Sequence, residues 1–291
     1  MTESTKRGAS ARASDTEGFI VYERKRGWAP LDLRELWRYR DLLYFLIWRD
    51  VLVRYKQAVF GVAWVILQPL LTMVVFTTVF NQIIGVKSPD DKLPYAVFSF
   101  AGLLPWQFFA GALARSGMSL VGNSNLLTKV YFPRLVIPLS AVLGGLVDLG
   151  ISFLVLLGLM AVYGIVPTWQ VIFLPLFVLL ALASAFAVGL WLSALNVLYR
   201  DVGYVIPFLV QLGMFMSPVI YPTSSIPAGS PLLLVFALNP MTGVIGGFRW
   251  ALLGQEFPGN YLLTSTAIVV VLLVGGLFFF KRMERVFADV V

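Results

Sequence analysis

Six long stretches of the sequence contain almost no charged side chain. A helix needs about 20 apolar residues to cross the hydrocarbon core of a membrane. Over the whole chain of 291 residues, 59% are hydrophobic and only 13% are charged, whereas a soluble domain carries about 25% charged residues. The sequence therefore predicts an all-α membrane protein with six transmembrane helices, at residues 60–84, 95–118, 135–163, 171–198, 202–221 and 261–280.

The positive charges are divided unevenly between the two sides of this arrangement. With a cytoplasmic N-terminus, 19 of the 22 Lys and Arg residues fall on the cytoplasmic side, and only Lys87, Lys92 and Arg249 fall on the other. Short cytoplasmic loops of membrane proteins carry such an excess of Lys and Arg. The sequence thus predicts that both termini are cytoplasmic.

The chain divides into four parts by composition. Residues 1–30 are polar and basic and have no signal-peptide pattern, so we expect a disordered cytoplasmic tail. Residues 31–57 have aromatic and apolar side chains at helical spacing between charges, which is typical of an amphipathic helix at a membrane surface or against a soluble partner. Residues 58–285 would form the transmembrane domain, and residues 286–291 a cytoplasmic C-terminus.

The apolar stretch before the last predicted span is interrupted. Residues 230–254 are broken by Asn239 and Pro240, and again by Gly246 and Gly247. Two short apolar pieces joined by such a break favour a re-entrant hairpin on the periplasmic side, which is tolerated where protein or water covers the backbone. The alternative is a loop that lies on the membrane surface.

Several kinds of chemistry are missing from these residues. The chain has no histidine and no cysteine, which excludes imidazole acid–base catalysis, thiolate chemistry and the usual zinc sites. It contains no Gly-Lys pair, and a P-loop for nucleotide phosphates requires one. We therefore expect no catalytic residue, metal site or nucleic-acid partner in this chain, and ATP hydrolysis would need a separate subunit.

Asp148 is the one ionisable residue deep within a predicted span, while Arg115 lies nearer the cytoplasmic end of another and can extend toward water. Asp148 either bonds a neighbouring helix or lines a translocation path, and both interpretations stay open. A proton relay usually chains several such groups. The sequence therefore disfavours an ion-coupled carrier.

Aromatic side chains gather around the second predicted span. Their faces could stack on sugar rings and form a weakly selective path, or they could belong to an interfacial belt and to helix packing. The candidates for the substrate path, beside Asp148, are Tyr95, Phe98, Trp106, Phe108 and Phe109.

Small residues recur at every fourth position in two other spans. They are Ala181, Ala185 and Gly189 in one span and Ala141 and Gly145 in the other. Such patterns permit close helix contact. They do not distinguish contact within one chain from contact between two.

Two predicted cytoplasmic loops have unusual composition. The first, residues 122–134, combines apolar and aromatic side chains with Lys129 and Arg134. Exposed apolar groups are costly unless they dock into a partner or return to the membrane surface. The second, residues 199–201, either makes a further contact or caps the adjoining helix ends.

Four stretches together resemble a known family. Residues 35–80, 119–143, 194–212 and 238–254 are similar, in order and in spacing, to the permease subunit of ABC-2-type exporters of O-antigen, capsule and teichoic acid polysaccharides. The likeness extends over about residues 33–285. It implies a six-helix permease in the cytoplasmic (inner) membrane of a bacterium.

The resemblance also implies partners. The permease would be a homodimer that docks two copies of an ATPase subunit, which binds ATP and Mg, so this chain would hold no cofactor of its own. The substrate would be a polyprenyl-linked polysaccharide that enters from the inner leaflet of membrane lipid. The function would be ATP-driven export of that polysaccharide, most specifically O-antigen, and the alternatives are a smaller lipid or drug as cargo, or an ion-coupled carrier.

The same resemblance assigns roles to segments. Residues 33–48 would be the interface helix, 125–134 the coupling helix, 199–201 a smaller contact loop and 240–254 the exit hairpin, with the aromatic set facing the sugar path. The coupling residues implied are Asn125, Leu126, Lys129, Tyr131, Phe132, Pro133, Arg134, Arg200 and Asp201, and the exit residues are Asn239, Pro240, Gly246, Gly247 and Arg249.

Overall fold

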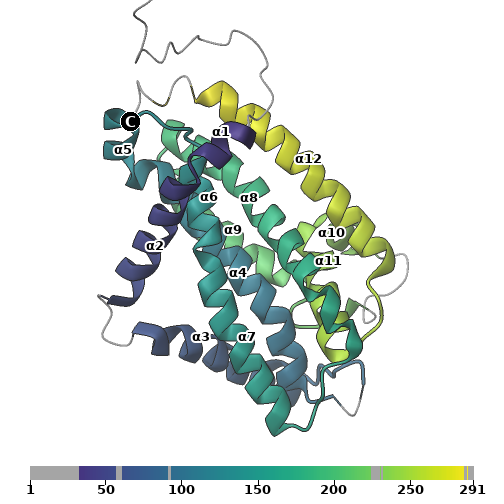
Figure 1. The fold of residues 1–291 in the computed structure, drawn as a ribbon. Coiled ribbons are helices and arrows are strands. Elements are labelled where there is room, and N and C mark those ends of the chain that lie inside the picture. The colour runs from purple at the N-terminus through teal and green to yellow at the C-terminus, as the bar shows by residue number, and fades with distance from the viewer. Residues whose placement is uncertain are drawn as a thin grey trace, which may run out of the picture. The chain divides into compact units, whose positions relative to one another are not determined.

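The computed structural model describes residues 33–56, 61–90, 93–223, 230, 232–284 and 287. The predicted tail at residues 1–30 lies outside this part of the chain, as does the predicted C-terminus apart from Phe287. Every regular element in the described part is a helix (Figure 1). The elements are α1 (Leu33–Arg38), α2 (Arg40–Lys56), α3 (Gly61–Phe76), η1 (Thr77–Ile83), α4 (Tyr95–Gly122), α5 (Ser124–Lys129), α6 (Val136–Leu143), α7 (Gly145–Val162), η2 (Trp169–Phe173), α8 (Leu174–Leu198), α9 (Val202–Phe215), α10 (Leu232–Leu238), α11 (Pro240–Leu253) and α12 (Gly259–Met283).

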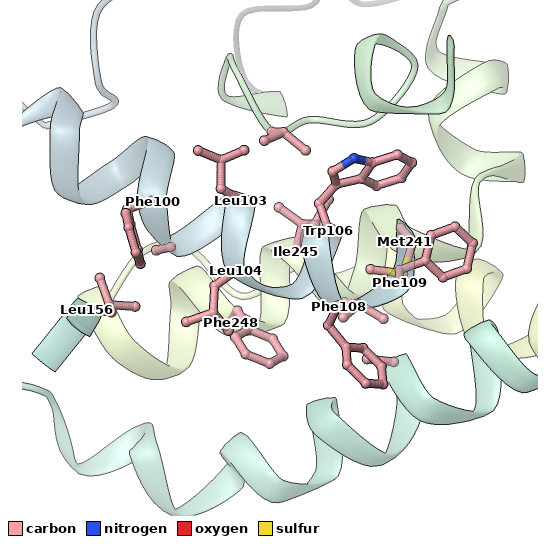
Figure 2. Packing of buried hydrophobic residues seen from close by; sticks show 14 of the residues in the cluster. Phe100, Leu103, Leu104, Trp106, Phe108, Phe109, Leu156, Met241, Ile245 and Phe248 are labelled. Atoms are coloured by element: carbon pink, nitrogen blue, oxygen red, sulfur yellow. The ribbon is translucent and has the colours of Figure 1, made fainter. Parts of the chain in front are cut away.

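Helix α4 is the centre of the bundle. In its most apolar window 83% of the residues are buried, against 17% to 28% in the other long apolar helices. It contacts α6, α7, α8 and α11, and Figure 2 shows its side chains meeting those of α7 and α11. The side chains in this contact include Phe100, Leu103, Leu104, Leu156, Met241, Ile245 and Phe248.

Five stretches are long and apolar enough to cross a membrane: Ala63–Ile83, Tyr95–Gly122, Val136–Val162, Trp169–Leu198 and Gly259–Met283. These five correspond to predicted spans. The sixth predicted span, at 202–221, is not confirmed, because α9 has 14 residues and a span needs about 20.

The chain leaves the helical path after α9 for a local reason. The helix ends at Phe215, and Ser217 precedes Pro218. The proline ring disfavours helical backbone in the residue before it. Hydrophobicity continues through Tyr221, and for that reason the apolar run appears longer than the helix.

The small residues of α8 allow close packing inside one chain. Ala181 and Ala185 are fully buried, and a Cβ on Gly189 would come within 2.5 Å of the Ser116 hydroxyl on α4. The predicted close contact is confirmed as one between α8 and α4. On the other side of α8, Trp191 donates a hydrogen bond to the carbonyl of Leu272 on α12 at 3.0 Å.

Candidate functional site: a charged cavity between α2, α3, α4 and α7

Asp148 is surrounded by cationic and hydroxyl donors. It forms an ion pair with Arg54 and accepts a hydrogen bond from the Tyr55 hydroxyl, both from the last turn of α2. The Arg115 Nη1 atom on α4 lies 3.5 Å from the same carboxylate. Three helices thus converge on one acidic side chain.

Asp148 lies near the middle of its candidate span, whereas Arg54 and Tyr55 lie at the end of α2, before the first candidate span begins. Asp148 is twelve residues after Val136 and fourteen before Val162 in its candidate span, which puts it about 18 Å along the helix axis. Burial, with a smaller contribution from the hydrogen bond to Asp148, raises the pKa of Tyr55 to about 12, so its hydroxyl remains a neutral donor at physiological pH. Ionisable groups at such depth usually mark a functional site.

A cavity of about 550 Å³ opens beside the cluster. Arg54, Arg115 and Asp148 contribute its charged lining, and Gln68 and Gln107 contribute amide groups. The remaining lining is largely apolar and includes Trp64, Val65, Leu104, Phe108 and Leu149. Such a mixture of apolar wall and convergent polar groups is typical of a binding pocket.

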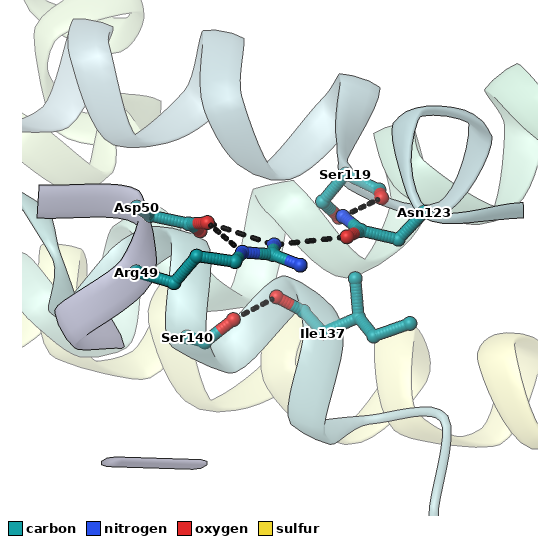
Figure 3. Close-up of polar contacts among 6 residues, drawn as sticks. All are labelled: Arg49, Asp50, Ser119, Asn123, Ile137 and Ser140. Atoms are coloured by element: carbon teal, nitrogen blue, oxygen red, sulfur yellow. Dashed lines mark hydrogen bonds and ion pairs between the residues drawn. The ribbon is translucent and has the colours of Figure 1, made fainter. Parts of the chain in front are cut away.

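Helix α2 is fixed at a second point, nearer the start of the helix. The Arg49 guanidinium donates to Asp50 at 2.8 Å and to the Asn123 side-chain oxygen at 2.9 Å, just after α4 ends (Figure 3). Asn123 in turn donates to the Ser119 carbonyl at 2.8 Å. These contacts hold α2 against the bundle, which is a contact that the predicted amphipathic helix, at a membrane surface or against a soluble partner, did not include.

Sequence reasoning selected Asp148 but missed its partners on α2. Arg54 and Tyr55 stand at the end of a segment interpreted only as amphipathic. The usable signal was the lone acidic residue, since a carboxylate at membrane depth requires a counter-charge. Arg54 supplies this counter-charge from the segment before the first span, although it lies 94 positions from Asp148 in the sequence.

The predicted coupling segment has a mixed environment. Tyr131 is 70% exposed, whereas Phe132 is 6% exposed and belongs to the interior. Arg134 donates to the backbone carbonyl of Glu284 after α12, and its guanidinium lies 5.9 Å from the Phe287 ring centre. Of the other residues assigned to coupling, Asn125, Lys129, Arg200 and Asp201 are exposed, and Leu126 and Pro133 are half-buried.

The predicted aromatic path is part of the packed core. Tyr95 donates a hydrogen bond to the Ile220 carbonyl at 2.7 Å, and the Trp106 and Phe109 rings lie 5.5 Å apart. All five aromatic residues of the set are buried, and Phe108 also lines the cavity. This environment matches the helix-packing alternative, and the role of the set in transport stays a prediction.

The interrupted stretch 230–254 forms two short helices with their break at the predicted position. Asn239 caps α11, since its side-chain oxygen accepts from the Met241 amide at 2.9 Å. A Cβ on Gly246 would meet Pro258 at 2.9 Å, and one on Gly247 would overlap the Phe177 ring. These two glycines therefore allow close approach of α11 to its neighbours.

Arg249 is a buried cation on α11 with no carboxylate partner among the described residues. It donates to the carbonyls of Pro218 at 2.6 Å and Val219 at 2.7 Å, and to that of Phe98 at 3.3 Å. Its guanidinium lies 3.6 Å from the centre of the Phe98 ring. Arg249 thus joins α11 to α4 and to the turn after α9.

Three known proteins that are similar to this chain have related names. The chain is 33% identical over 258 residues to the O-antigen export system permease protein RfbA of Myxococcus xanthus, which covers 88% of this chain and 98% of that protein. It is 29% identical over 255 residues to a protein of the same name from Klebsiella pneumoniae, covering 86% and 95%. It is 25% identical over 232 residues to the polysialic acid transport protein KpsM of Escherichia coli, covering 77% and 88%.

The family model gives the same result as these relatives. It describes the ABC-2 type transporter and matches residues 41–253, which is more than half of the chain and includes α2 to α11. Together with the apolar helices, the match establishes a multi-pass membrane permease. This chain therefore belongs to the ABC-2 type transporter family.

Proposed function

We propose that this chain is the transmembrane permease of an ATP-driven exporter that moves lipid-linked O-antigen polysaccharide across the inner membrane of a bacterium. The similarity to the O-antigen export permease of Myxococcus xanthus carries the proposal, because it extends over nearly the whole of both chains. The names of these relatives, an O-antigen export permease and a polysialic acid transport protein, favour this cargo over smaller lipids or drugs.

The partner in this proposal is a separate ATPase, because the 291 residues lack a P-loop. Exposed Tyr131 and Tyr199 lie in the two predicted cytoplasmic loops and support docking there. We further propose a homodimer with both termini cytoplasmic, in agreement with the distribution of Lys and Arg.

Three finer features belong to the same proposal. Helix α9 with the turn after it would complete a sixth crossing, α1 and α2 would form the cytoplasmic interface element, and α10 and α11 would form the re-entrant hairpin. The break at Asn239 and the capping of the α9 end support the hairpin. Pairing of Asp148 with two guanidinium groups argues against an ion-coupled carrier, since it leaves little freedom for a proton relay.

Deletion of the gene in its own bacterium tests the function. Surface O-antigen should disappear while lipid-linked glycan accumulates inside the cell, and plasmid-borne wild-type chain should restore the surface glycan. Normal surface glycan in the deletion strain, with no second permease gene, would overturn the proposal.

A further inference from the structure

The cavity between α2, α3, α4 and α7 carries an excess of positive charge. Its charged lining residues are Arg54, Arg115 and Asp148, so two guanidinium groups face one carboxylate. Excess charge on partly buried side chains is costly, and such groups often mark a functional site. An anion bound in the cavity would neutralise it.

Both guanidinium groups have donors to offer such an anion. Arg54 contacts Asp148 through Nη1, and Arg115 places Nη1 near Asp148 and donates through Nε to the Ala141 carbonyl at 3.4 Å. A guanidinium carries five N–H donors. The described residues therefore occupy only a minority of the donors on these two side chains.

The chemistry of the lining favours a phosphate group attached to a lipid. Planar guanidinium forks match the oxygens of phosphate. The cavity is also walled by apolar side chains and reaches the surface at α3, where the lining residue Trp64 is 53% exposed. A volume of about 550 Å³ would hold a head group and the first part of a chain.

We propose that this cavity binds the phosphate head group of a lipid-linked substrate through Arg54 and Arg115. Asp148 neutralises part of the charge of the two guanidinium groups before the phosphate arrives and is displaced when it binds. The inference rests on the proposed function and names the residues of this chain that would recognise the lipid-linked end of the cargo.

This arrangement makes Asp148 a competitor of the ligand. A carboxylate that only supported the fold would weaken binding when removed, or leave binding unchanged. A carboxylate that competes for the same guanidinium groups would strengthen binding when it is replaced by the neutral amide. The direction of the Asp148→Asn effect therefore separates the two roles.

The first experiment compares ligands on the full chain. Purified protein in a phosphate-free maltoside detergent is titrated calorimetrically with farnesyl diphosphate, farnesol and inorganic diphosphate. Farnesyl diphosphate should bind at least about tenfold more tightly than either of the others, because only it offers both charge and chain. Equal binding of farnesol would overturn the phosphate site, and equal binding of inorganic diphosphate would overturn the lipid source.

The second experiment compares variants. Arg54→Gln and Arg115→Gln should each weaken farnesyl diphosphate binding by about tenfold, since each removes charge-assisted hydrogen bonds. Asp148→Asn should tighten binding several-fold. Arg40→Gln is the matched control, because it makes the same change on the same helix at an exposed side chain outside the cavity, and it should have no effect.

Folding is checked independently of binding. Size-exclusion elution and thermal unfolding are recorded for each variant, and Arg115→Lys, which keeps the charge, should retain partial binding. Unchanged affinity in both Gln variants, or weaker binding in a folded Asp148→Asn protein, would overturn the proposal. The assay contains no ATPase and no glycan, so its failure would leave the export function standing. Normal surface glycan in the deletion strain would overturn the export function whatever the binding assay gives.

Discussion

Arg54 and Asp148 join the last turn of α2 to the middle of the α6–α7 stretch. This contact joins residues 94 positions apart in the sequence and lies beside a cavity. The position of α2 therefore depends on an ion pair between two partly buried side chains. That dependence can be measured.

Arg54→Gln and Asp148→Asn should each lower the free energy of unfolding by about 1–3 kcal/mol, because each removes the ion pair between these two partly buried groups. The double variant should cost less than the sum of the two. Thermal or denaturant unfolding in detergent provides the measurement.

The matched control for this ion pair is the pair of Lys281, on α12, and Glu284, just after it, at 3.5 Å, in which the Lys281 side chain is more exposed. Its loss in Lys281→Gln should cost no more than about 1 kcal/mol. Simple additivity of the Arg54 and Asp148 changes would show that the two side chains are not coupled.

Arg249 should be essential for the packing of α11. Arg249→Met leaves three buried carbonyls without their donor, and we expect a loss of about 3 kcal/mol or more. Gly102→Ala should also destabilise the protein, since its Cβ would come within 2.6 Å of the Arg249 guanidinium. Stability is read from the unfolding midpoint in detergent.

Gly150→Ala provides the control for Gly102→Ala. Both glycines are helical, but no atom lies within 4 Å of a Cβ at Gly150. Alanine there should be neutral or stabilising by up to about 1 kcal/mol. Equal effects at the two positions would contradict the assigned role of the Gly102 contact.

Asn239 should stabilise the junction between α10 and α11. Besides capping α11, it donates to the Met216 carbonyl at 3.0 Å and to the Ser217 hydroxyl at 2.8 Å. Asn239→Ala should cost about 1–3 kcal/mol and Asn239→Ser less, because serine can retain the cap. Asn260→Ala, at an exposed side chain, is the control. Equal losses of stability at Asn239 and Asn260 would refute the stabilising role of Asn239 at this junction.

Substitutions of Tyr131 and Phe132 should distinguish an effect on ATPase coupling from an effect on folding. Tyr131→Ala should lower ATPase activity in the assembled complex while changing the unfolding midpoint much less than Phe132→Ala does, because its side chain is exposed. Phe132→Ala should destabilise the permease by about 3 kcal/mol, because it empties a buried site. Wild-type ATPase activity in Tyr131→Ala would remove that residue from the contact surface.

The helical character of the chain and the break at Asn239 could be predicted from local signals. A long apolar stretch indicates a membrane helix, and asparagine followed by proline indicates a helix start. Both signals are local, so neither depends on distant residues. The end of α9 was missed, although Ser217 and Pro218 signalled it, because hydrophobicity alone continued to Tyr221.

The charged cavity depends on contacts that sequence periodicity does not encode. Asp148 could be selected alone, but its pairing with Arg54 joins residues 94 positions apart. Likewise Arg249 was counted as a positive charge on the outer side, whereas it is buried against three carbonyls. Long-range pairing of polar groups is decided by packing, which local patterns leave open.

Transport by inverted membrane vesicles is the direct test of whether this chain is the permease of an ATP-driven exporter. Vesicles containing this chain and its ATPase are supplied with ATP and radiolabelled lipid-linked O-antigen, and the glycan that becomes protected from an added glycosidase is counted. If this chain is the export permease, protection depends on ATP and is lost when this chain is omitted. Protection that is equal without the chain, or that persists without ATP but collapses with the proton gradient, would contradict it.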